Sequence, residues 1–125
     1  MPLITSPIRV LVVEDETLIR ADIVKSLQIA GFDVLESANA DEAIQMLERN
    51  SDIRLVFTDI DMPGSMSGLK LAAAVRDRWP PIKIIATSGH FKIHDGDLPK
   101  DARFLPKPYQ PEQIISAIHE LTGAA

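Results

Sequence analysis

Residues 8–31 read IRVLVV-EDE-TLIRADIVKSLQIA-G, and within them one hydrophobic period gives way to another. The first six residues form a short run that is rich in β-branched side chains and apolar except for Arg9, which is typical of a buried strand. Residues 17–30 then carry apolar side chains at helical spacing, and Gly31 is placed to end that helix. This stretch therefore predicts a strand, an acidic turn and an amphipathic helix.

The same alternation continues along the rest of the chain. Short apolar runs predict further strands at residues 32–36, 53–58, 82–87 and 102–105. Helices are predicted after the capping pair Asn39 and Glu42, over residues 69–79, and from Pro111 to residue 121. Strands that alternate with helices are typical of βαβ units, in which helices cover both faces of a parallel sheet.

One segment interrupts this pattern. Between residues 90 and 101, Gly96, Pro99 and scattered charges support at most a short or irregular helix. This would be the fourth helix of the alternation. We therefore expect an α/β domain whose fourth helix is irregular or shortened.

The composition limits the class of protein. The 125 residues fit one domain, which we expect to span residues 1–125 with a core over about residues 8–121. A net charge of −5 argues against direct nucleic-acid binding. The chain has no cysteine, no signal-peptide pattern, and no apolar run near the roughly 20 residues of a membrane helix. These features predict a cytoplasmic domain with no membrane insertion.

Chemically active side chains follow four of the predicted strands. In chain order they are Glu14, Asp15, Asp59, Asp61, Ser88 and Lys107. In open parallel sheets, ligands bind at the carboxyl ends of the strands, so these side chains are expected to converge. Each one alone could be a helix cap, a turn residue or a solvated charge, but their joint placement favours a functional site.

Converging acids have a specific chemistry. Two carboxylates about 4 Å apart repel by roughly 1 kcal/mol in water and by about 4 kcal/mol at an effective dielectric near 20. Three such acids must bind protons or a cation, and an all-oxygen ligand set suits Mg²⁺. A metal, an ammonium group and a hydroxyl would together stabilise a phosphoryl group that arrives on the central acid.

These residues, in this order, resemble the receiver domain of two-component response regulators. The resemblance is carried by VVED at residues 12–15, FTDIDMP at 57–63, TSG at 87–89 and FLPKPY at 104–109. It extends over nearly the whole chain. It implies a flavodoxin-like, doubly wound sheet of five parallel strands in the order 2-1-3-4-5.

The resemblance also assigns roles to the acids. Asp59 would be the phosphoacceptor. The metal, Mg²⁺ or Mn²⁺ in its place, would be held by Glu14, Asp15, Asp59 and the backbone carbonyl of Asp61. These assignments are the family's, transferred to the matching positions of this chain.

The remaining roles concern catalysis and conformational switching. Lys107 would be the family's invariant lysine, joined to Pro108 by a cis peptide bond, and Ser88 would act with it on the phosphoryl group. Ser88 would also be the switch hydroxyl and Phe104 the switch aromatic. Thr87 directly precedes Ser88 and is the alternative switch hydroxyl.

The resemblance implies a signalling domain rather than an enzyme. A sensor histidine kinase or a histidine phosphotransfer protein would donate the phosphoryl group. A downstream protein target or effector domain would respond to it, and a phosphorylation-dependent homodimer is also compatible with the family. Whether the domain acts alone, in a phosphorelay or within a larger protein stays open.

Two other functions fit parts of this pattern. Asp59-Ile60-Asp61 also satisfies the Asp-x-Asp nucleophile motif of haloacid-dehalogenase-type phosphatases. That motif normally continues into Thr or Val, whereas Met62-Pro63 follows here, and the chain is too short downstream for a second acidic motif and a cap. The other alternative is a receiver-like scaffold that is never phosphorylated, which the complete set of acids, hydroxyl and lysine argues against.

Overall fold

The computed structural model describes residues 7–62, 64, 66–89 and 96–123. Its strands β1 to β5 span Arg9–Val13, Asp33–Ser37, Ile53–Asp59, Lys83–Ser88 and Arg103–Pro106. Its helices α1 to α4 span Thr17–Ile29, Ala40–Arg49, Gly68–Arg78 and Pro111–Thr122. Every strand and helix expected from the hydrophobic periods is present, except in the segment discussed below, and the strand ends differ from the prediction by at most one residue.

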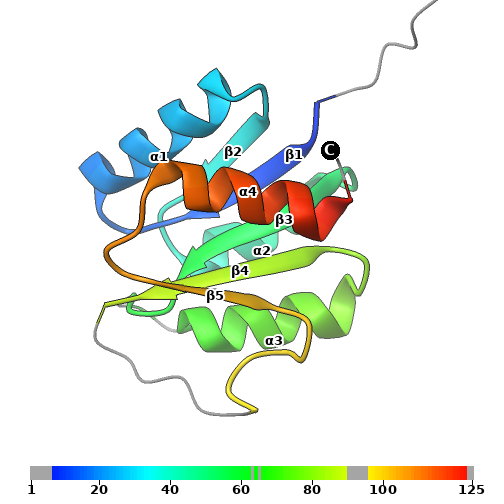
Figure 1. Cartoon of the computed structure of the whole chain (residues 1–125). Coiled ribbons are helices and arrows are strands. Elements are labelled where there is room, and N and C mark those ends of the chain that lie inside the picture. The colour runs from blue at the N-terminus through cyan, green and yellow to red at the C-terminus, as the bar shows by residue number, and fades with distance from the viewer. Residues whose placement is uncertain (1–6, 63, 65, 90–95, 124–125) are drawn as a thin grey trace, which may run out of the picture.

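The five strands form one parallel sheet in the order β2-β1-β3-β4-β5 (Figure 1). This order confirms the flavodoxin-like topology that the resemblance implied. The register pairs Val13 with both Ser37 and Thr58, and it pairs Asp59 with Thr87. The carboxyl ends of the strands are therefore level with one another, and the residues that follow them share one edge of the sheet.

Helices cover both faces of the sheet. α2 and α3 pack on one face, and α1 and α4 pack on the other (Figure 1). Successive side chains of a strand point to opposite faces, so β1 serves both cores. Leu11 and Val13 lie in the core under α2 and α3, whereas Val10 and Val12 lie in the core under α1 and α4. This double burial explains why the strands read as almost continuous apolar runs.

The helix ends follow the predicted capping chemistry. The Asn39 side chain accepts a hydrogen bond from the Glu42 N–H at 2.8 Å. The Glu42 carboxylate accepts from the Ala38 N–H at 3.2 Å, one residue before the position that a standard capping box uses. α1 ends at the C-cap Ala30, and Gly31 follows with a φ of 99°, a left-handed conformation that glycine adopts without strain.

The segment between β4 and β5 departs from regular alternation, as predicted. Residues 96–101 form turns and bends, so the described part of this connection contains no helix. The other half of the predicted irregular helix, residues 90–95, lies outside the described residues. Leu98 packs against the core under α2 and α3 and anchors the segment to the sheet.

Among the residues that the structure describes, no helix has the length and apolar character needed to span a bilayer.

Candidate functional site at the carboxyl edge of the sheet

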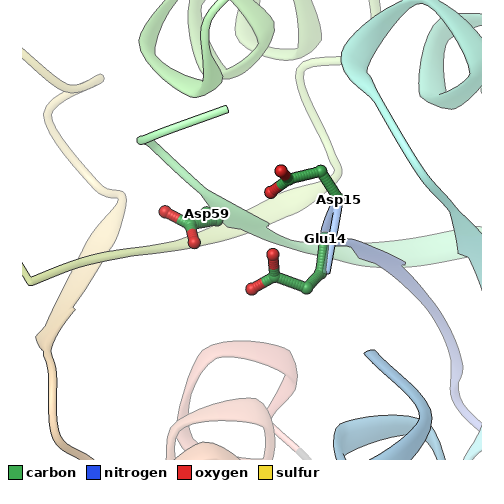
Figure 2. A group of neighbouring side chains, drawn as sticks. All are labelled: Glu14, Asp15 and Asp59. Carbon is green, nitrogen blue, oxygen red and sulfur yellow. The ribbon is translucent and has the colours of Figure 1, made fainter. Parts of the chain in front are cut away.

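Three acids converge where β1 and β3 end. Glu14 and Asp15 follow β1, and Asp59 is the last residue of β3 (Figure 2). Each offers a carboxylate oxygen, and these oxygens all lie within 4.8 Å of one another. The three acids that the sequence predicted as metal ligands are therefore brought together by the strand order, because β1 and β3 are neighbours in the sheet.

Asp59 is held through both of its carboxylate oxygens. Its Oδ2 lies 2.7 Å from Nζ of Lys107, and its Oδ1 accepts a hydrogen bond from the Asp61 N–H at 2.8 Å. Only 3% of Asp59 is exposed to solvent. The loop after β5 thus delivers a cation directly onto the acid at the end of β3. Charge-assisted hydrogen bonds of this kind fix the orientation of a carboxylate.

Glu14 is the most perturbed acid of the cluster. Burial is the main cause that raises the pKa of Glu14, to about 7, and the hydrogen bond that it accepts from the Glu16 N–H opposes the shift. Asp15 and Asp59 raise the pKa further, because their charges and hydrogen bonds disfavour a second anion nearby. Near neutral pH this site therefore takes up a proton readily, and a bound cation would relieve the same repulsion.

Two neighbours complete the electrostatic environment. Burial lowers the pKa of Lys107, but its hydrogen bond to Asp59 and the surrounding carboxylates raise it by more, so the ammonium keeps its charge. The half-buried Tyr109 packs edge-on against Phe57, with ring centroids 5.8 Å apart. Burial, and then the charges of Glu14 and Asp59, raise the pKa of Tyr109 to about 12, so its hydroxyl stays neutral.

Ser88 reaches the site through Asp61. Its hydroxyl donates a hydrogen bond to Oδ2 of Asp61 at 2.6 Å, and only 3% of Ser88 is exposed. The Asp61 side chain is thereby directed to Ser88 and is not one of the three carboxylates that cluster. The neighbouring Thr87 is fully buried, and its hydroxyl makes no hydrogen bond within the described part of the chain.

The remaining predicted residues lie near this edge in different ways. The Lys107–Pro108 peptide bond is cis, as the resemblance implied. Phe104 is half-buried in β5 and pairs in register with Ala86 of β4. The residues that the structure brings together at the site are Glu14, Asp15, Asp59, Asp61 and Lys107.

Two supporting residues were not anticipated from the sequence. Gly68 begins α3, and a Cβ built there would lie only 2.2 Å from the Asp59 carbonyl oxygen. A glycine inside the first turn of a helix is unfavourable by propensity, which is the signal that could have marked this close approach. Arg20 of α1 donates to the Glu14 carbonyl oxygen. Nothing in the local sequence indicates that contact.

The pKa of Glu14 predicts how stability depends on pH. Because the folded-state pKa of about 7 lies above the ordinary value of 4.5, the associated stability is fully present below pH 4.5 and is lost as the pH rises through 7. In the presence of a chelator, the free energy of unfolding should fall between pH 5 and pH 8 by on the order of 2–3 kcal/mol. Denaturant titrations at several pH values would measure it.

The matched variant is Glu14→Gln, which keeps the side-chain size and removes the titration. We expect its stability to vary less with pH over the same range. An equal slope in both chains would show that other groups, such as the three histidines, cause the dependence.

Known proteins are similar to this chain in sequence. The family model described as "Response regulator receiver domain" matches residues 10–119. The response regulator receiver protein CpdR of Brucella abortus (strain 2308) is 32% identical over 120 residues, which cover 94% of this chain and 98% of CpdR. The sensor kinase CckA of the same strain is 36% identical over 116 residues; these cover 90% of this chain but only 12% of CckA.

Solved structures agree with the sequence comparison. The crystal structure of a response regulator receiver protein from Sinorhizobium medicae WSM419 superposes with a TM-score of 0.87 at 29% identity, covering 94% of this chain and 96% of that one. These matches favour a phosphoacceptor domain of two-component signalling over the phosphatase and the unphosphorylated scaffold. The chain belongs to the response regulator receiver domain family.

Proposed function

We propose that this domain accepts a phosphoryl group on Asp59, with Mg²⁺ bound beside it. The observation that carries the proposal is the cluster itself: three carboxylates within 4.8 Å of one another, with the Lys107 ammonium 2.7 Å from Asp59. Asp59 is a buried carboxylate with a cation on one oxygen, and a metal ion held by the clustered acids would offset the negative charge that otherwise repels a phosphoryl group.

The donor set fits Mg²⁺. The carboxylates of Glu14, Asp15 and Asp59 and the backbone carbonyl of Asp61 would hold it, and all of these donors are hard oxygen ligands. Burial first, and then the neighbouring Asp15 and Asp59, raise the pKa of Glu14 to about 7, and a bound cation would favour the ionised form of this carboxylate. When bound, the ion supplies positive charge next to the phosphoryl oxygens, and Mn²⁺ has similar ligand preferences.

The chain's own residues would perform the transfer. A carboxylate oxygen of Asp59 attacks the phosphorus of a phosphohistidine, the new P–O bond forms as the P–N bond breaks, and the electron pair leaves with the histidine nitrogen. Lys107 already pairs with Oδ2 of Asp59 and is placed to compensate the charge that the phosphoryl group brings. The Lys107 side chain is 29% exposed, so its ammonium group can move toward an arriving phosphoryl group.

The source and the destination of the phosphoryl group follow from the family. The donor would be a sensor histidine kinase or a histidine phosphotransfer protein, and the output would pass to a protein target or an effector domain. A phosphorylation-dependent homodimer is a further expectation. We propose that residues 1–125 form one receiver domain, that it is located in the cytoplasm, and that it works as a signalling domain rather than as a turnover enzyme.

The proposal is tested by phosphorylation with a small donor. In acetyl phosphate with Mg²⁺, the chain should gain one phosphoryl group by intact-mass spectrometry, and with a chelator in place of Mg²⁺ the gain should fall by at least tenfold. Equal uptake with and without the metal would contradict the proposed role of the acidic cluster.

A separate prediction concerns the switch. Ser88 donates to Asp61 at 2.6 Å, so its hydroxyl must leave that carboxylate before it can donate to a phosphoryl group on Asp59. Ser88→Ala should therefore still become phosphorylated but lose most of the remote conformational response. Amide chemical shifts at Phe104 and in α4 on addition of beryllofluoride would measure this response. Equal remote shifts in both chains would show that Ser88 is not the switch hydroxyl, and Thr87 would be the next residue to test.

A further inference from the structure

Arg20 connects the metal-binding end of β1 to β2. It lies near the start of α1, and only 15% of its side chain is exposed. Its Nη1 donates to the backbone carbonyl oxygen of Glu14 at 2.7 Å, and its Nε donates to Oε1 of Glu36 at 3.0 Å. The planar guanidinium thus joins a backbone group beside the acidic cluster to a carboxylate on the neighbouring strand.

The carbonyl that Arg20 holds belongs to the peptide group between Glu14 and Asp15. Because a peptide group is planar, fixing its C=O direction constrains ψ of Glu14 and φ of Asp15 together. The Glu14 N–H is also bonded, to the Ser37 carbonyl oxygen at 3.1 Å. Hydrogen bonds therefore hold the peptide groups on both sides of the Glu14 Cα. Arg20 holds the second of these, which also contains the N–H of Asp15.

We infer that Arg20 is a positioning residue for the metal site, an inference that rests on the proposed function. By holding the Glu14–Asp15 peptide, it aims the two carboxylates at the space that Asp59 shares with them. Its charge is paired with Glu36, so its influence on the site is chiefly geometric. Groups that orient metal ligands from outside the coordination shell commonly change metal affinity by about 10–100-fold.

The geometry distinguishes arginine from lysine at this position. The two hydrogen bonds of Arg20 leave from different nitrogens of one rigid plane, Nη1 and Nε. A lysine ammonium keeps the positive charge but offers a single nitrogen on a flexible stem, so it cannot reproduce that spacing. Arg20→Lys should consequently keep the local charge and lose part of the orientation, whereas Arg20→Met loses both.

The chain offers a matched control. Arg54 also donates to a backbone carbonyl oxygen, that of Thr122, at 3.1 Å, but it is exposed and lies in the first half of β3, away from the carboxyl edge. Arg54→Met removes one arginine, one positive charge and one bond to a carbonyl, as Arg20→Met does. It tests whether any effect on the metal arises from net charge alone.

The experiment is a Mg²⁺ titration of the full chain, followed by amide chemical shifts well below the melting temperature of each variant. We expect the Kd for Mg²⁺ to rise about tenfold in Arg20→Met, to rise less in Arg20→Lys, and to stay unchanged in Arg54→Met. A purely structural role would lower the melting temperature of the metal-free variant and leave the Kd of its folded form unchanged.

The outcomes separate this inference from the proposed function. No Mg²⁺ binding by the unmodified chain would overturn the proposed function and this inference with it. Binding by the unmodified chain with the same Kd in Arg20→Met would overturn the inference alone. Should Arg20→Met fail to fold, Arg20→Lys decides, because an unchanged Kd there would show that the two-nitrogen bridge is not needed.

Discussion

A chain that carries Asp59→Asn should take up no phosphoryl group from acetyl phosphate and Mg²⁺, and it should still fold. Asparagine has nearly the same shape as aspartate. Its amide oxygen can accept the hydrogen bond from Lys107, but its NH2 group cannot accept the one from the Asp61 N–H. The amide is not a nucleophile under these conditions, because its nitrogen lone pair is delocalised into the carbonyl. The substitution also removes one of three clustered negative charges, so we expect little loss of metal-free stability.

Intact-mass spectrometry with peptide mapping would measure this effect. The matched control is Asp77→Asn, an exposed aspartate on α3, which should be labelled as the unmodified chain is. The assignment of Asp59 would be wrong if Asp59→Asn retained the label while folded, as judged by its circular dichroism and amide spectrum.

Gly68→Ala should produce the largest loss of stability among conservative changes near the site. A Cβ at this position would lie 2.2 Å from the Asp59 carbonyl oxygen and 2.6 Å from Cα of Ile60, both of which are backbone atoms. Backbone cannot rotate away as a side chain does, so α3 or the end of β3 must move. We expect the free energy of unfolding to fall by about 3 kcal/mol, equivalent to roughly 10 °C in melting temperature.

The effect should extend to function, because the displaced backbone carries Asp59, the proposed phosphoacceptor. Denaturant unfolding gives the stability, and the rate of phosphoryl uptake by the folded fraction gives the functional effect. Gly89→Ala is the stability control, since its Cβ would meet only the Lys107 side chain, at 3.5 Å, in ordinary van der Waals contact. Equal stabilities of the two variants would show that the backbones of α3 and β3 can move apart at Gly68 with little loss of stability.

Much of the fold was predictable because it depends on local periodicity. The change from apolar strand to amphipathic helix in residues 8–31 recurs along the chain, and helix caps such as Asn39 are read from neighbouring residues. The weak pattern between residues 90 and 101 likewise predicted the missing regular helix, as far as residues 96–101 show. The strand order was different: it came from the family resemblance, since periodicity does not say which strands are neighbours.

The acidic cluster was predictable for a related reason. Once a parallel sheet is expected, residues that follow its strands must gather at one edge, so Glu14, Asp15, Asp59 and Lys107 were expected to meet. Their separations depend on register and on side-chain rotamers: the carboxylate oxygens lie within 4.8 Å of one another, and Asp59 lies 2.7 Å from Lys107. No pattern along the chain encodes those quantities.

By itself, then, the sequence determined the alternating elements, the edge at which chemistry gathers and the residue types present there, because these follow from hydrophobic period and chain direction. Only the tertiary structure decided that Ser88 rather than Thr87 bonds Asp61, that Arg20 holds the Glu14 carbonyl, and that α3 needs a glycine against Asp59. Each of these depends on two segments far apart in the chain meeting at a particular distance, and such distances are set by the packing of the whole domain.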